Sequence, residues 1–190
     1  PHVSRLFRDE SALAALNHKA LHSPKVRVVN EDAFTWLEQH PDEIFDVIVI
    51  DFPDPSNYSL GKLYTTTFYE LVDRHLAASG FLAVQSTSPL VARRSYWTVV
   101  TTLEAVGLQT LPYHAHVPSF GEWGFVLASR RPWREPEAWP PALRYVTREG
   151  FASMRHFPPD MSRVDAPVNR LTNQALVHLF EQEWGRVREP

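Results

Sequence analysis

FDVIVIDFPDP, residues 45–55, is the stretch that decides the fold. Its opening run, FDVIVI, is apolar and β-branched except at Asp46, which is typical of a strand buried in a parallel sheet. Asp51 ends the run, and two prolines then flank a second acid, Asp54. Because proline fixes its own φ angle, the sequence predicts two carboxylates held in a stiff turn at a strand end.

Helical and strand patterns alternate on both sides of this stretch. Apolar spacing predicts helices over 11–21, 33–40, 62–77 and 92–107. Apolar and β-branched runs predict strands over 26–29, 81–85, 108–117 and 124–129, the last two as an antiparallel pair. This alternation indicates an α/β sheet with helices on both faces.

The pattern changes after residue 131. A proline-rich stretch over 132–141 predicts a stiff linker. Residues 142–190 carry helical patterns, so we expect a domain over 1–131 followed by a helical C-terminal appendage packed on it. Four apolar residues near one face predict a docking helix, with a homodimer contact as the alternative: Leu171, Leu176, Leu179 and Phe180.

Composition excludes several classes of protein. The chain has 190 residues and a net charge of −3, with no basic block, which argues against nucleic-acid binding. It has no cysteine, so it has no disulfide framework and no thiolate zinc site, which fits a reducing compartment. No apolar run approaches the roughly 20 residues that a membrane-spanning helix needs.

Polar side chains follow three consecutive predicted strands. Asp32 follows the strand at 26–29, Asp51 and Asp54 follow the next, and Gln85 ends the third. In open α/β sheets, ligands bind beyond the carboxyl ends of the strands. Paired carboxylates there suit an ammonium group, or can accept a proton from an amine before it attacks. The alternative is structural: Asp51 caps the next turn and Asp54 begins a β-turn.

Four segments together resemble the polyamine aminopropyltransferases, the spermidine synthase family. They are EDAF (31–34), FDVIVIDFPDP (45–55), LYTTTFYELVDRHLAASGFLAVQ (63–85) and VPSFGEWGFVLAS (117–129). Details such as DFPDPSN and PSFGEWGF are most similar to a bacterial branch with an N-terminal membrane region. The resemblance covers residues 1–130 and implies a Rossmann-like, methyltransferase-type, mostly parallel sheet.

The resemblance also implies a reaction and roles for residues. An aminopropyl group would pass from decarboxylated S-adenosylmethionine, a co-substrate, to a diamine such as putrescine, leaving methylthioadenosine. No tightly bound cofactor or metal is implied. Asp51 would be the catalytic base or charge partner of the attacking amine, and Asp54 and Gln85 would bind the amine. Asp32 and Ala33 would bind the adenine of the donor.

Three further residues are expected to contact the substrate. Tyr64 would line the pocket, although its spacing also fits the core, and Trp123 would offer an apolar or cation–π surface. Phe120 takes the place of a family tyrosine, so a hydroxyl is missing there. Asn57 and Tyr58 also depart from the family pattern and would change the wall beside the amine.

The family's glycine-rich strand and turn, and the acid that holds the donor's ribose, have no counterpart in these residues. We therefore expect a C-terminal part of a longer catalytic domain, lacking its first strands and inactive by itself. Val47 and Val49 would then lie on an unpaired strand edge, covered by another copy or by other chain. The expected location is cytoplasmic, with tethering to the inner membrane if a membrane region lies upstream.

Alternatives to this interpretation stay open. A methyltransferase of the same fold would use ordinary S-adenosylmethionine, and a non-catalytic domain would bind polyamines without product. His114 and His116 could share one face of a strand, but no third ligand has the spacing of a metal site.

Overall fold

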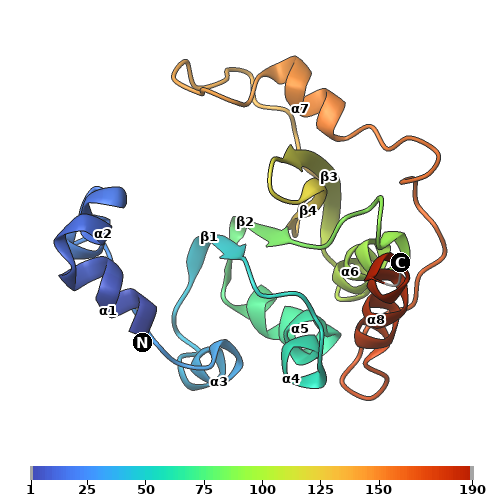
Figure 1. Cartoon of the computed structure of the whole chain (residues 1–190), viewed down its shortest axis with the longest axis horizontal. Coiled ribbons are helices and arrows are strands. Elements are labelled where there is room, and N and C mark those ends of the chain that lie inside the picture. The colour runs from blue at the N-terminus through green and yellow to red at the C-terminus, as the bar shows by residue number, and fades with distance from the viewer. Residues whose placement is uncertain (1, 189–190) are drawn as a thin grey trace. The chain divides into compact units, whose positions relative to one another are not determined.

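The computed structural model describes residues 2–188 and separates into two compact units, residues 1–39 and 40–190. Figure 1 labels the helices and strands of both units. None of the helices in the described part of the chain is long and apolar enough to cross a membrane.

The first unit is helical. Its elements are α1 (His2–Asp9), α2 (Ser11–Leu16), the short 3-10 helix η1 (Ala20–His22) and α3 (Ala33–Gln39). The helix predicted over 11–21 is interrupted because His18 and Lys19 have φ angles of 51° and 57°, in the left-handed region.

The strand predicted over 26–29 is wrong, because these residues form no strand. The three valines of the run are 39–42% exposed. A short β-branched run needs a neighbouring strand to satisfy its backbone groups, and none pairs with this one among the described residues.

The second unit contains one sheet of four strands in the order β1-β2-β4-β3 (Figure 1). The strands are β1 (Phe45–Ile50), β2 (Leu76–Gln85), β3 (Gln109–Val117) and β4 (Gly121–Ser129). β1 and β2 are parallel, whereas β4 pairs antiparallel with both β2 and β3, so the predicted antiparallel pair is confirmed. Only one of the three strand pairings is parallel, so the described sheet is mixed rather than mostly parallel.

β1 is an edge strand, as the sequence analysis expected. Val47 is 62% exposed and Val49 70% exposed, whereas Ile50, at the end of the strand, is 4% exposed. The prediction that both faces of this strand are buried is therefore wrong within the described residues. Because β1 pairs only with β2 in the described sheet, its other edge can accept a further strand.

The helices of this unit are α4 (Tyr58–Gly61), η2 (Lys62–Tyr64), α5 (Thr66–Arg74), α6 (Arg93–Ala105), α7 (Arg148–Met154) and α8 (Ala175–Arg188). The helix predicted over 62–77 is shorter, because the Thr65 side chain caps α5 by accepting from Phe68 N, and β2 already begins at Leu76. Gly107, with a φ of 90°, follows the end of α6, as predicted.

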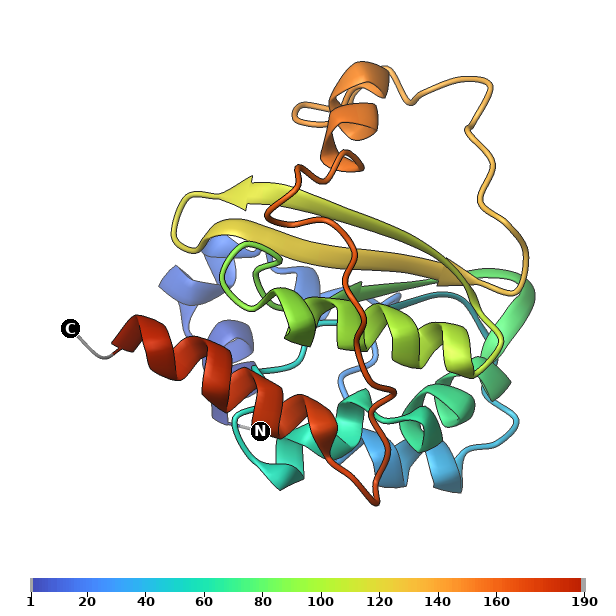
Figure 2. The ribbon, with the colours of Figure 1, turned by 90° about the vertical axis from the view of Figure 1, so that its right-hand side faces the viewer.

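Helices cover both faces of the β3–β4 hairpin. On one face, Tyr96 of α6 is fully buried and donates to Phe125 O at 3.0 Å. On the other face of the hairpin, Tyr113 packs against Phe151 of α7. Figure 2 shows α6 and α8 side by side, with α7 across the hairpin from them. The predicted helices on both faces are confirmed for this hairpin.

The last helix packs within its own chain, as its docking interpretation predicted. Leu176, Leu179 and Phe180 are buried, but Leu171 precedes α8 and is 44% exposed, so its place on the docking face is wrong. Asn169, fully buried, anchors the segment before α8: its Nδ2 donates to Tyr64 O at 3.0 Å, and its Oδ1 accepts from Leu176 N at 3.1 Å. The domain boundaries at 131 and 141 stay a prediction.

Candidate active site

The turn after β1 carries Asp51 and Asp54 and is held from the protein interior. The hydroxyl of Tyr64 donates to Pro53 O at 3.1 Å and lies 3.3 Å from Phe52 O. The ring of Phe52 packs edge-on against Phe68, with 5.7 Å between ring centroids. The two acids are therefore presented by a turn whose backbone is hydrogen-bonded as well as restricted by proline.

Tyr64 is 3% exposed and belongs to the core, while its hydroxyl contacts the turn that carries the two acids. Burial raises the pKa of its hydroxyl well above the ordinary value, and the carboxylates of Asp54 and Asp51 raise it further. The hydroxyl therefore stays protonated and keeps donating to the turn.

Gln85 ends β2, which pairs with β1 so that Val84 lies beside Ile50. Of the two orientations of its amide, one pairs every donor with an acceptor. In that orientation Nε2 donates to Asp51 Oδ1 at 2.8 Å and to Phe52 O at 3.2 Å, while Oε1 accepts from Trp123 Nε1 at 2.7 Å. The parallel register of two neighbouring strands thus brings Asp51 and Gln85 into contact.

Trp123 and Phe120 lie in the β3–β4 hairpin. Their ring centroids are 5.1 Å apart, but Trp123 is 6% exposed whereas Phe120 is 63% exposed. The hairpin therefore offers a fixed indole that is hydrogen-bonded to Gln85 and a more open phenyl ring beside it.

A small pocket with room for about one water molecule lies next to Asp54. It is lined by Asp54, Pro55, Tyr64, Ser86, Thr87, Val99 and Leu176. Ser86 is 4% exposed, and its hydroxyl oxygen has no hydrogen-bond partner among the described residues. The pocket therefore combines an apolar wall with a carboxylate and an unpaired hydroxyl.

Asp32 and Ala33 lie in the other unit, at the start of α3. Asp32 Oδ1 accepts from Thr35 N at 3.1 Å, which caps the helix. Their assignment to the adenine stays a prediction.

Asn57 and Tyr58, which depart from the family pattern, both have structural contacts. Asn57 caps α4, because its Oδ1 accepts from Leu60 N at 3.0 Å. The ring of Tyr58 lies edge-on to His178 of α8, with 5.9 Å between ring centroids.

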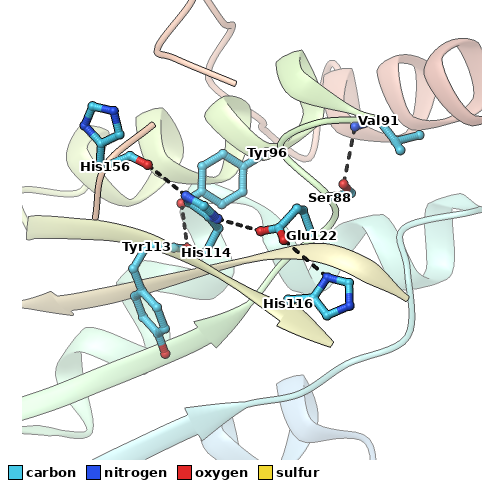
Figure 3. Close-up of polar contacts among 8 residues, drawn as sticks. All are labelled: Ser88, Val91, Tyr96, Tyr113, His114, His116, Glu122 and His156. Carbon is cyan, nitrogen blue, oxygen red and sulfur yellow. Dashed lines mark hydrogen bonds and ion pairs between the residues drawn. The ribbon is translucent and has the colours of Figure 1, made fainter. Parts of the chain in front are cut away.

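His114 and His116 share one side of β3, as predicted, and both face Glu122 (Figure 3). His114 Nδ1 lies 2.8 Å from Glu122 Oε2, and His116 Nδ1 lies 3.3 Å from Glu122 Oε1. The second ring nitrogen of His114 lies 2.9 Å from His156 O, so both of its nitrogens already have partners. Residues 2–188 contain no cluster of three or more His, Cys, Asp or Glu residues suited to a metal ion.

Sequence reasoning missed Trp184 of α8 and its partner Thr87, which follows β2. Trp184 Nε1 donates to Thr87 Oγ1 at 3.0 Å, and the Trp184 ring lies 6.1 Å from the ring of Trp123. Phe180 and Trp184 are four residues apart on one helix, and this spacing could have added Trp184 to the docking face. Its contact with the hairpin could not be read from spacing.

Residues 9–135 match the family model described as the spermine/spermidine synthase domain. A polyamine aminopropyltransferase of Leptospira interrogans is 50% identical over 185 residues, which are 97% of this chain and 37% of that protein. Polyamine aminopropyltransferase 2 of Ralstonia nicotianae is 48% identical over 189 residues, 98% of this chain and 37% of that protein. The chain thus spans little more than a third of these relatives' length.

Solved structures agree on the fold. The crystal structure of a spermidine synthase in complex with the transition-state analogue AdoDATO superposes with a TM-score of 0.66 at 20% identity, covering 80% of this chain and 56% of that one. The crystal structure of spermidine synthase from Thermotoga maritima superposes with a TM-score of 0.64 at 20% identity, covering 80% of this chain and 55% of that one. The Rossmann-like class expected from the resemblance is confirmed. By the match over 9–135, the chain belongs to the spermine/spermidine synthase family.

Proposed function

We propose that this protein, at full length, transfers an aminopropyl group from decarboxylated S-adenosylmethionine to a diamine such as putrescine. The lone pair of the amine nitrogen attacks the aminopropyl carbon bonded to the sulfonium sulfur. A carbon–nitrogen bond forms as the carbon–sulfur bond breaks, and methylthioadenosine leaves with the electron pair. The nitrogen loses one proton, for which a nearby carboxylate is a suitable acceptor.

The observation that carries this proposal is the pairing of Asp51 with Gln85 in a chain of this family. Gln85 Nε2 donates to Asp51 Oδ1 at 2.8 Å, which leaves the other carboxylate oxygen for the attacking amine. We assign Asp51 as the base or charge partner, and Gln85 as the residue that orients it. In-line attack on a sulfonium depends mainly on positioning, which a hydrogen-bonded carboxylate provides.

Asp54 and its surroundings are assigned to the far, cationic end of the amine. The pocket beside it is lined partly by apolar side chains, and the Asp54 carboxylate suits an ammonium. Tyr64, Phe120 and Trp123 complete the acceptor side, while Asp32 and Ala33 are assigned to the donor's adenine.

The proposal extends to assembly and location. The exposed β1 edge, with Val47 and Val49, supports cover by further strands or by a second copy in a homodimer. We place the reaction in the cytoplasm, tethered to the inner membrane where a membrane region precedes the domain. Light scattering of the purified full-length protein measures the oligomeric state.

Mass spectrometry tests the reaction. The full-length protein is incubated with decarboxylated S-adenosylmethionine and a panel of diamines. The proposal expects methylthioadenosine together with one amine that is heavier by an aminopropyl unit, and this product also names the acceptor. Methylated product from ordinary S-adenosylmethionine would instead establish the methyltransferase alternative, and amine binding without any product would establish a binding domain.

A further inference from the structure

The C-terminal helix α8 contacts the candidate site through Trp184. The indole N–H of Trp184 donates to Thr87 Oγ1 at 3.0 Å, and its ring lies 6.1 Å from the ring of Trp123, at an interplanar angle of 47°. Phe180, one turn earlier on the same helix, packs against Trp184 with 6.0 Å between centroids. Trp184 therefore links α8 to the indole that donates to Gln85.

Trp123 supports the orientation in which the Gln85 amide turns its nitrogen toward Asp51. Trp123 Nε1 is a donor only, so Gln85 turns its oxygen toward it at 2.7 Å and its nitrogen toward Asp51. If Trp123 moves away, the amide oxygen loses its donor, and the side chain is restrained only through its nitrogen, by Asp51 and Phe52 O. The reversed amide would set a carbonyl oxygen against the Asp51 carboxylate, which is repulsive.

Trp184 is itself held in place by its neighbour in sequence. The Glu183 carboxylate accepts from the backbone N–H groups of Arg94 and Ser95, each at 2.9 Å, and from Ser95 Oγ at 2.6 Å. These groups form the first turn of α6, where unpaired N–H groups and the helix dipole favour a carboxylate. α8 is thus anchored to α6 one residue before the tryptophan that contacts the site.

The segment after β2 connects to both the hairpin and α8. Gly124 N donates to Thr87 O at 3.1 Å, and Ser86 N donates to Gly124 O at 2.9 Å. Trp184 binds the side chain of the same Thr87. One helix residue therefore contacts the indole of Trp123 and also the segment that directly follows Gln85.

The geometry points to Trp184 as a positioning residue for the amine acceptor, acting through Trp123 and Gln85 on Asp51. This inference rests on the proposed function only in assigning the Asp51–Gln85 pair to the amine. Loss of the Trp184 ring should raise the KM for the amine more than it lowers kcat, and should leave the KM for the donor unchanged. A purely structural role would lower the amount of folded enzyme and leave both KM values unchanged.

The test uses the full-length protein with the variants W184L, W184F and T87V. W133L is the matched control, because Trp133 is a half-buried indole that packs on Phe151 and not on the site. W184L should raise the amine KM about tenfold or more. W184F keeps a ring against Trp123 and should restore most of the amine affinity. T87V removes only the hydrogen bond and should give a smaller rise than W184L.

A second readout does not need turnover. With 5-fluorotryptophan incorporated, the fluorine resonance of Trp123 is assigned by its loss in W123F. It should shift or broaden in W184L but stay unchanged in W133L. An unchanged Trp123 resonance together with an unchanged amine KM in W184L overturns the inference.

The two proposals can fail separately. If the wild-type protein makes no aminopropyl product, the proposed function fails, while the Trp123 resonance still decides whether Trp184 positions that indole. If W184L does not fold, the amine KM and the Trp123 resonance are compared with wild type in W184F and T87V instead. A T87V variant with a wild-type amine KM and an unmoved Trp123 resonance would also contradict the inference.

Discussion

The amide nitrogen of Gln85 lies 2.8 Å from a carboxylate oxygen of Asp51, across two neighbouring parallel strands. Because β1 and β2 run in the same direction, both residues leave the sheet at the same edge. The hydrogen bond restrains the carboxylate in one orientation, and the opposite side of the amide is fixed by Trp123. This relationship makes Asp51 the group whose removal should matter most.

Replacement of Asp51 by asparagine should abolish turnover. The variant keeps the size of the side chain but cannot accept a proton from the amine or balance its charge, so we expect kcat/KM in the full-length protein to fall at least about 100-fold. D42N, which changes an exposed acid away from the site, is the control. Near-wild-type activity in D51N would refute the role assigned to Asp51.

Buried tyrosines should make the protein sensitive to alkali. Burial raises the pKa of Tyr64, Tyr69 and Tyr96 above the ordinary value. In the unfolded chain these hydroxyls ionise near pH 10, whereas the folded state keeps them protonated. Their contribution to stability is therefore complete below about pH 10 and is lost as the pH rises further.

Urea unfolding at a series of alkaline pH values measures this effect. Y64F should weaken the dependence on pH, and should cost about 1 kcal/mol at neutral pH because the turn loses the Tyr64 hydroxyl. Y58F, at a side chain that is 59% exposed, is the matched control. An alkaline slope that is identical in Y64F and wild type would contradict the prediction.

Replacement of Asn169 by alanine should loosen the segment before α8. Its Nδ2 donates to Tyr64 O and its Oδ1 accepts from Leu176 N, and both partners would be left buried and unpaired. We expect a loss of about 3 kcal/mol in the free energy of unfolding. N30A, at an exposed asparagine, is the control and should stay within about 0.5 kcal/mol. A wild-type unfolding curve for N169A would disprove this role.

Replacement of Gly124 by alanine should be strongly destabilising. An added Cβ would contact the buried ring of Tyr96 and come within 2.7 Å of Thr87 O, and neither group has room to move. We expect a cost of about 2–3 kcal/mol. G185A is the matched control in α8, where nothing lies within 4 Å, and alanine should stabilise the helix by up to about 1 kcal/mol. Thermal unfolding of both variants checks the difference, and equal melting temperatures would show that the hairpin can accommodate a methyl group.

Local patterns predicted α6, β3 and β4 well, because each carries its own signal of helical spacing or of a short apolar run, along with a turn or a glycine at its end. They failed where an interaction with another residue or strand decides whether the element forms. Residues 26–29 read as a strand, but form none among the described residues, since a strand exists only when its backbone groups find a neighbour. Thr65 likewise divides a continuous helical pattern, because its side chain caps a new helix.

By itself, the sequence determined the family, the turn that carries Asp51 and Asp54, and the candidate role of Gln85. These depend on residues close together in the chain and on an ordered set of motifs. Only the tertiary structure decided that Gln85 contacts both Asp51 and Trp123, and that Trp184 reaches the same group from α8. Such contacts join residues that are far apart in sequence, and no periodicity records them, because they depend on strand register and on how the last helix docks.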